Sequence, residues 1–128
     1  MLLPTTLSLA AAATVINLWL LMRCGQARAN ARIMYGDGGD ETLLRRMRAH
    51  ANFTENTPLV LILCALIEAA GKSGSWLQIV GGIYMLARIA HAIGMGGLVP
   101  ARAFGMLVTL LTQLGLVIVA VLILLGKF

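Results

Sequence analysis

Long apolar runs separated by short polar stretches dominate the sequence. Residues 1–22 and 103–126 carry no charged side chain, whereas the apolar runs at 49–70 and 74–93 are interrupted by ionisable and amide side chains. A helix needs roughly 20 mainly apolar residues to cross a bilayer. The pattern therefore predicts one all-α domain over residues 1–128, an integral membrane four-helix bundle with up-down topology. Its spans are expected at about residues 3–27, 43–70, 75–93 and 102–126.

The stretches between these runs carry turn signals. Residues 36–40 read Gly-Asp-Gly-Gly-Asp, residues 72–75 read Lys-Ser-Gly-Ser, and Pro100 follows a glycine-rich segment. Glycine and proline clusters of this kind mark connections between helices. A cleaved signal peptide carries basic residues before its apolar run, and here the first basic residue is Arg23. We therefore expect the first span to be retained.

The composition fits a protein that is solvated by lipid. The chain is 59% hydrophobic and 12% charged, against about 25% charged residues in a typical soluble domain. This excludes an ordinary water-soluble enzyme, a disordered chain and a disulfide scaffold. An aromatic content of 5% argues against a nucleic-acid surface. Cys24 and Cys64 border or lie in apolar runs, which predicts buried thiols rather than a disulfide.

Basic residues are distributed unevenly over the predicted connections. Lys72 is the only basic residue of the second connection, and Arg88 and Arg102 flank the third. Because basic residues favour the cytoplasmic side, we expect the first and third connections in the cytoplasm and both termini in the periplasm. The first connection and the helix ends beside it hold six arginines: Arg23, Arg28, Arg32, Arg45, Arg46 and Arg48.

Three polar residues of the second span share one stripe of the helix. Arg48, Asn52 and Glu55 follow at i, i+4 and i+7, within about 60° of the helix surface. Ionisable residues inside a span cost ~2.5 kcal/mol or more, so they usually face a protein interior or a wet cavity. The stripe can hold one zwitterionic ligand; alternatively, Glu55 pairs with a helix-end arginine and locks the bundle. Pro58 is expected to kink this helix.

A second polar pair, Arg88 and His91, lies at i and i+3 in the third span. By itself, Arg88 is typical of an interfacial residue whose charge reaches the headgroups, or of a partner for Glu55. His91 lacks companions at metal-ligand spacing, and His50 and His91 alone do not make a zinc site. We expect no metal. Glu68, near the other end of the second span, is expected to be interfacial.

Residues 48–58, Arg-Ala-His-Ala-Asn-Phe-Thr-Glu-Asn-Thr-Pro, resemble the signature of the MAPEG family, the membrane-associated proteins in eicosanoid and glutathione metabolism. The resemblance covers nearly the whole chain, including four spans, a basic first loop, Ala87-Arg88 and an arginine that opens the fourth helix. Residues 35–39 resemble the small bacterial members in particular. The resemblance implies a homotrimer in the bacterial inner membrane. Its partners would be membrane lipid, a lipophilic small molecule, and glutathione as co-substrate between neighbouring subunits near the cytoplasmic face.

The resemblance also implies roles for individual residues. Arg102 matches the fourth-helix arginine that is assigned to thiolate stabilisation in some members. A guanidinium beside the sulfur favours the thiolate anion, and a helix N-terminus after Pro100 adds partial positive charge. Alternatively, Arg102 is only a cytoplasmic topology anchor. The expected glutathione-binding residues are Arg28, Arg32, Arg48, His50, Asn52, Glu55, Arg88 and His91.

The chain departs from eicosanoid-type members at three positions. Those members carry tyrosines where this chain has Asn56, His91 and Met95, which weakens the case for eicosanoid substrates. We therefore expect a glutathione-dependent transferase or peroxidase that acts on lipophilic electrophiles. The alternative is a non-catalytic membrane protein that binds lipid or a small molecule, or that serves as an assembly partner.

Overall fold

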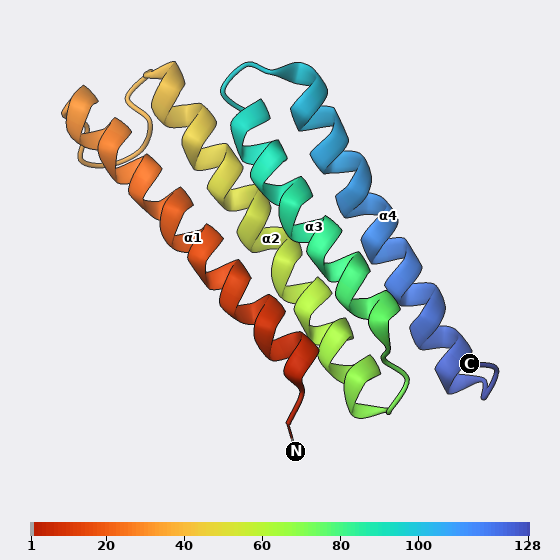
Figure 1. Ribbon diagram of the computed structural model, residues 1–128. Coiled ribbons are helices and arrows are strands. Elements are labelled where there is room, and N and C mark those ends of the chain that lie inside the picture. The colour runs from red at the N-terminus through yellow and green to blue at the C-terminus, as the bar shows by residue number, and fades with distance from the viewer. Residues whose placement is uncertain (1) are drawn as a thin grey trace.

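The computed structural model describes residues 2–128 and contains four helices. They are α1 (Pro4–Ala31), α2 (Glu41–Ala69), α3 (Ser75–Gly94) and α4 (Val99–Leu124), and no strand occurs among the described residues, so the expected all-α fold is confirmed. Met1, at the start of the first apolar run, lies outside them. Figure 1 shows the helices side by side, with the α1–α2 and α3–α4 connections at one end and both termini at the other. We call the first of these ends the arginine-rich end; it includes residues 32–40 and 95–98.

Local signals determine where the helices begin and end. α1 extends past residue 27 and ends where Arg32 adopts a left-handed conformation with φ of 55°. The side chain of Asp40 caps α2 by accepting a hydrogen bond from the Leu43 N–H at 2.8 Å. α4 begins before residue 102 because Pro100 lies in its first turn, where the missing N–H of proline has no cost. The first turn of α4 therefore includes Arg102.

Three of the four helices, α1, α3 and α4, are long and apolar enough to cross a membrane. α2 has 29 residues and continues through Pro58 as one helix, but its N-terminal half is rich in charged residues. Many large apolar side chains of α1, α3 and α4, such as Leu18, Ile83 and Leu110, are exposed. Apolar surface on this scale is what lipid contact requires. The structure thus describes a helical membrane protein.

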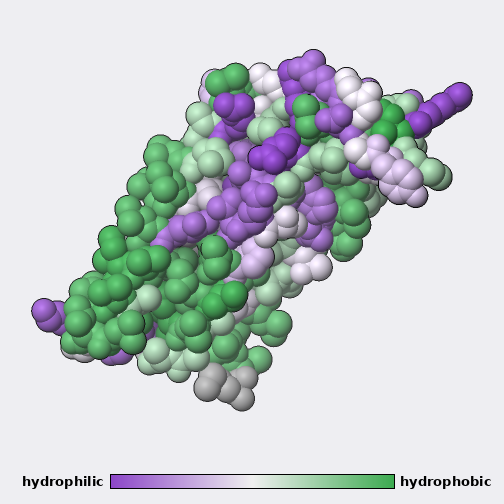
Figure 2. Space-filling model, turned by 180° about the vertical axis from the view of Figure 1, so that it is seen from behind, coloured by the Kyte–Doolittle hydropathy of each residue, from purple (hydrophilic) through white to green (hydrophobic). Residues whose placement is uncertain are grey.

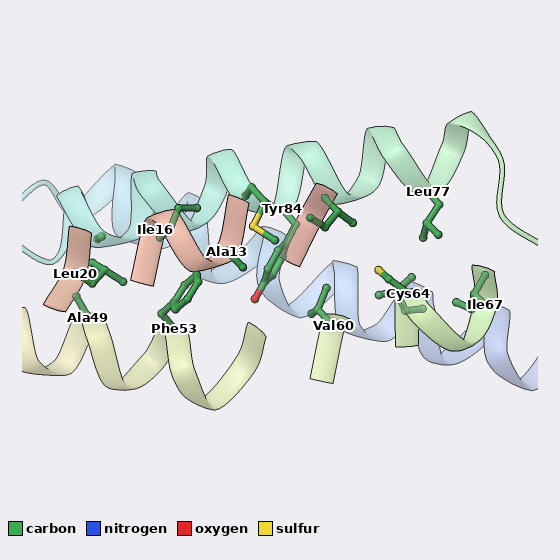
Figure 3. Close-up of a cluster of buried hydrophobic side chains, with 14 residues drawn as sticks. Ala13, Ile16, Leu20, Ala49, Phe53, Val60, Cys64, Ile67, Leu77 and Tyr84 are labelled. Carbon is green, nitrogen blue, oxygen red and sulfur yellow. The ribbon is translucent and has the colours of Figure 1, made fainter. Parts of the chain in front are cut away.

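A buried apolar cluster fills the space between the helices (Figure 3). The Tyr84 ring lies inside it, and its hydroxyl is 3.0 Å from the hydroxyl of Thr57 on α2. A buried polar group costs free energy unless it has a partner, and this pair satisfies both hydroxyls. The other labelled side chains in Figure 3 are Ala13, Ile16 and Leu20 of α1, Ala49, Phe53, Val60, Cys64 and Ile67 of α2, and Leu77 of α3.

α3 and α4 come close together at two glycines. A Cβ added to Gly94 would lie 2.2 Å from the backbone nitrogen of Arg102, and one added to Gly105 would lie 2.4 Å from the Cβ of His91. Small residues allow the backbones of membrane helices to approach each other closely. The two glycines therefore fix the position of α4 relative to α3 and hold His91 in a narrow seam.

The carboxylate of Glu68 closes the N-terminal end of α1. Its Oε1 accepts a hydrogen bond from the Thr5 N–H, and its Oε2 accepts from the N–H and the hydroxyl of Thr6, all at 2.8 Å. The first N–H groups of a helix have no partner within that helix. Glu68 therefore does more than the interfacial role expected from its position: it stabilises α1 and links it to α2.

Candidate functional site

Arg88, on α3, is the centre of a buried polar network. Its side chain is 1% exposed. Nη1 donates to the Thr109 hydroxyl at 2.9 Å, and Nη2 donates to Oδ1 of Asn52 at 2.5 Å. The Thr109 hydroxyl in turn donates to the Gly105 carbonyl at 2.8 Å. Arg88 therefore links α2, α3 and α4 and orients the amide of Asn52.

No carboxylate balances the charge of Arg88. The only ion pair among residues 2–128 joins Arg45 to Glu41 at the arginine-rich end. The structure shows neither the interfacial position nor the pairing with Glu55, because the Arg88 side chain is buried and its hydrogen-bond partners are neutral. The ring of Phe53, whose centroid is 5.9 Å from Cζ of Arg88, adds a favourable cation–π contact. A positive charge thus lies directly behind Asn52.

Amide side chains continue this network toward the molecular surface. Asn56 Nδ2 donates to the Asn52 carbonyl at 2.7 Å, and Gln113 Nε2 donates to Asn56 Oδ1 at 2.9 Å. All three amide residues are half-buried. Figure 2 shows a hydrophilic strip that extends from the polar end of the molecule into an otherwise apolar face. The network therefore connects the buried guanidinium to half-buried amide side chains between α2 and α4.

Arg48 and Glu55 lie on the same stripe of α2 as Asn52, and both are exposed. Two contacts between α1 and α2 show how far along the bundle Glu55 lies. On one side of it in the chain, His50 Nε2 lies 2.8 Å from Asn17 Oδ1, and on the other side Glu68 binds the start of α1. Along the bundle axis, Glu55 therefore lies between these two levels, at the height of the uncharged run of α1. An ionised side chain facing lipid at that depth costs ~2.5–3.5 kcal/mol or more. Lipid alone is therefore an unfavourable cover for this face.

Arg28 belongs to α1, and His50 lies on another side of α2 than the Arg48–Asn52–Glu55 stripe. They border a groove of about 390 Å³ between α1 and α2. Arg28 donates to the Gly36 carbonyl at 2.9 Å and so holds the first connection, whereas Arg32 is exposed at the end of α1. The structure does not bring these three residues together with the Arg48–Asn52–Glu55 stripe within one chain.

Arg102 and His91 differ in exposure, although both lie where α3 packs against α4. Arg102 is exposed in the first turn of α4, and its guanidinium makes no hydrogen bond or ion pair within residues 2–128. His91 is 3% exposed, and its Nδ1 has no hydrogen-bond partner among those residues. Arg102 is thus available to a ligand, whereas His91 is enclosed by the packing of α3 against α4.

Sequence reasoning missed the neutral partners of the candidate residues. After its first turn, α4 has three polar residues, Thr109, Thr112 and Gln113, of which Thr109 and Gln113 lie at i and i+4. Asn17 is the only amide in the uncharged run of α1. Polar side chains in a span tend to face a protein partner. Their spacing could therefore have predicted a polar face on α4 and a polar contact between α1 and α2.

Comparison with known proteins gives one family match. A family model described as "MAPEG family" matches residues 6–122. Two curated relatives, both described as "Inner membrane protein YecN", come from Escherichia coli K12 and Escherichia coli O6:H1 strain CFT073. Each is 33% identical over 85 residues, which is 62% of this chain and 64% of the relative. The chain thus covers less than two thirds of these relatives. No solved structure matches it.

Proposed function

Because the chain belongs to the MAPEG family, we propose that it is a glutathione-dependent transferase or peroxidase for lipophilic electrophiles. The inner membrane relatives and the apolar helices support an integral protein of the bacterial inner membrane. We further propose that all four helices span it in up-down order. The arginine-rich end would face the cytoplasm, because basic residues favour that side, and both termini would be periplasmic.

The exposed stripe of α2 is the observation that carries this proposal. Arg48 and Glu55 are charged and exposed on a face that a bilayer would otherwise cover. A second copy of the chain can cover this face, and a homotrimer gives every copy the same environment. Arg28, Arg32 and His50 face away from the stripe in one chain. In the proposed assembly, a neighbouring subunit brings such residues to the stripe.

The stripe fits the charge pattern of glutathione. The tripeptide carries carboxylates, an ammonium group and a thiol; Arg48 can bind a carboxylate, and Glu55 can bind the ammonium group. Asn52 presents its amide between them, and Arg88 holds that amide in place from behind. A side chain that is already oriented loses less entropy when a ligand binds. Arg88 and His91 would then act as positioning residues within each subunit.

In the proposed reaction, Arg102 stabilises the glutathione thiolate. The thiol releases its proton to solvent, and the exposed guanidinium of Arg102, which stays charged at any relevant pH, favours the anion. The thiolate sulfur then attacks the electrophilic carbon. A sulfur–carbon bond forms as the bond to the leaving group breaks. With an organic hydroperoxide, the thiolate sulfur instead attacks the terminal oxygen, so that the O–O bond breaks, glutathione sulfenic acid forms and the alcohol leaves after it takes up a proton. A second glutathione thiol then attacks the sulfenic sulfur, which gives the disulfide and water.

Thiolate absorbance and turnover test this proposal. Glutathione added to the detergent-solubilised protein should produce the ultraviolet absorbance of a bound thiolate, and a chlorinated aromatic should be conjugated with release of chloride. Arg102→Ala should reduce both signals. Lys72→Ala, at the opposite end of the bundle, removes the same charge and should leave both unchanged. The proposal is rejected if an intact oligomer shows neither thiolate nor conjugation.

The buried Arg88 favours a second candidate function. Two of its donors already bind Asn52 and Thr109 within the chain, so Arg88 has a structural role without any ligand. The exposed stripe of α2 can likewise serve only to hold subunits together. Polar contacts between membrane helices average ~0.6 kcal/mol each, and several would hold subunits together. In this non-catalytic protein, Glu55→Gln and Arg102→Ala would lower the stability of the oligomer, and glutathione would not change its melting temperature. A glutathione-dependent rise in melting temperature excludes this alternative.

A further inference from the structure

Three arginines converge on a cavity of about 270 Å³ at the arginine-rich end. The cavity lies between the C-terminal half of α1, the first turns of α2 and the C-terminal end of α3. None of the three arginines belongs to the proposed glutathione site. The lining residues are Arg23, Thr42, Arg45, Arg46, Ala92, Met95 and Gly96.

Hydrogen bonds between different elements hold the three guanidinium groups in place. Arg46 Nη1 donates to the Arg23 carbonyl at 2.8 Å, Arg23 Nη1 donates to the Ala92 carbonyl at 3.3 Å, and Arg45 Nη1 donates to the Gly96 carbonyl at 3.3 Å. Cζ of Arg23 also lies 5.0 Å from the ring centroid of Trp19. Orientation in a membrane requires only positive charge on one side. It does not require three side chains to be fixed around one cavity.

The cavity keeps an excess of positive charge and unused donors. Glu41 pairs with Arg45, so three arginines against one glutamate leave a net charge of +2. Arg23 and Arg46 each use one N–H on a carbonyl, although a guanidinium has five. An anion with several oxygens matches these donors, because guanidinium groups bind phosphate with paired hydrogen bonds.

The size and position of the cavity define the ligand further. A volume of about 270 Å³ is below the range of roughly 300–1,000 Å³ that is typical of drug-sized ligands, so it suits a small anionic group. Basic pockets between membrane helices bind the headgroups of anionic lipids. We propose that this cavity binds a phosphate group, supplied by the headgroup of an anionic phospholipid or by a small phosphate in water.

Ligand-dependent melting of the detergent-solubilised protein in phosphate-free buffer tests this site. The probes are phosphatidylglycerol, inorganic phosphate and, as a zwitterionic control, phosphatidylcholine. Because a ligand that binds the folded state raises the melting temperature, phosphatidylglycerol or inorganic phosphate should raise it more than phosphatidylcholine does. A rise with phosphatidylglycerol alone identifies the lipid as the source. A rise with inorganic phosphate identifies a small phosphate.

Single arginine substitutions test whether the rise in melting temperature comes from binding in this cavity. Arg23→Gln and Arg46→Gln should each weaken the apparent affinity roughly tenfold, which corresponds to about 1.4 kcal/mol. Arg45→Gln provides a further variant with a half-exposed side chain if either of these fails to fold. Arg32→Gln removes one charge from the same end of the bundle but outside the cavity. This variant should bind the phosphate probe with the same apparent affinity as the unsubstituted protein. The proposal is overturned if neither phosphate probe raises the melting temperature, or if the cavity variants respond like Arg32→Gln.

Discussion

Replacing Asn52 by leucine should lower the free energy of unfolding, because the buried positive charge of Arg88 loses a hydrogen-bond acceptor. Arg88 is 1% exposed and has two side-chain acceptors, Asn52 Oδ1 and the Thr109 hydroxyl. Its Nε already has no hydrogen-bond partner among residues 2–128. Asn52→Leu keeps a similar volume and removes one of the two acceptors. The buried cation would then depend on Thr109 and on the ring of Phe53.

The expected loss of unfolding free energy depends on the positive charge of Arg88. A hydrogen bond to a charged group contributes ~1.5–3 kcal/mol, whereas polar contacts between membrane helices average ~0.6 and reach ~1.7 kcal/mol. Because Arg88 is charged and enclosed, we expect Asn52→Leu to lower the free energy of unfolding by about 2 kcal/mol. Arg88→Met with Asn52→Leu removes the cation together with its acceptor. The double variant should therefore lose about 1–2 kcal/mol less than the two single variants combined.

Unfolding in mixed micelles with increasing sodium dodecyl sulfate, followed by circular dichroism at one protein concentration, measures these differences. Thr54→Val is the matched control, because the exposed Thr54 hydroxyl donates only to the Ala51 carbonyl of its own helix. Its effect should stay within about 0.5 kcal/mol. If Asn52→Leu is as stable as Thr54→Val, or if the two single-variant losses simply add, Arg88 does not depend on Asn52.

The same titration tests three further contacts. Glu68→Ala removes the carboxylate that caps α1 and should cost about 1–2 kcal/mol; an unchanged stability would show that the cap is replaced by solvent. Gly105→Ala should cost about 1–3 kcal/mol by forcing α3 from α4, whereas an added Cβ at Gly115 meets nothing within 4 Å, so Gly115→Ala should be neutral or stabilise by up to about 1 kcal/mol. Equal effects at the two glycines would contradict the close approach. Tyr84→Phe removes the hydrogen bond with Thr57 and should cost about 1 kcal/mol, and no loss would mean that this bond contributes nothing.

The helices could be predicted because their signals are local. Apolar runs of sufficient length and the clusters at residues 36–40 and 72–75 separate four elements without any knowledge of tertiary contacts. The residues at which the helices end were less predictable. α1 continues through Gly25 and past residue 27 because residues 27–31 contain no glycine or proline, and it ends where Arg32 takes a left-handed conformation. Glu68 looked interfacial because its partner, the start of α1, is more than 60 residues away in sequence.

Of the candidate site, the charged stripe of α2 could be predicted from the sequence, and the spacing of Thr109 and Gln113 gave a further signal on α4. Helical periodicity alone places Arg48, Asn52 and Glu55 on one stripe. The partners of Arg88 depend instead on where α3 crosses α4, and two glycines of that seam decide this crossing. Sequence spacing could not distinguish Glu55 from Asn52 as the group that Arg88 contacts. Such long-range contacts follow from packing rather than from a local pattern.

Calorimetric titration of glutathione into the detergent-solubilised protein tests most directly the proposal that the exposed face of α2 is a glutathione site between subunits. The unsubstituted protein should give a saturable heat. Glu55→Gln should weaken the affinity at least roughly tenfold, because the ammonium group loses its charged partner, while the size of the oligomer stays the same. The claim is contradicted if glutathione gives no saturable heat, or if Glu55→Gln binds it as tightly as the unsubstituted protein.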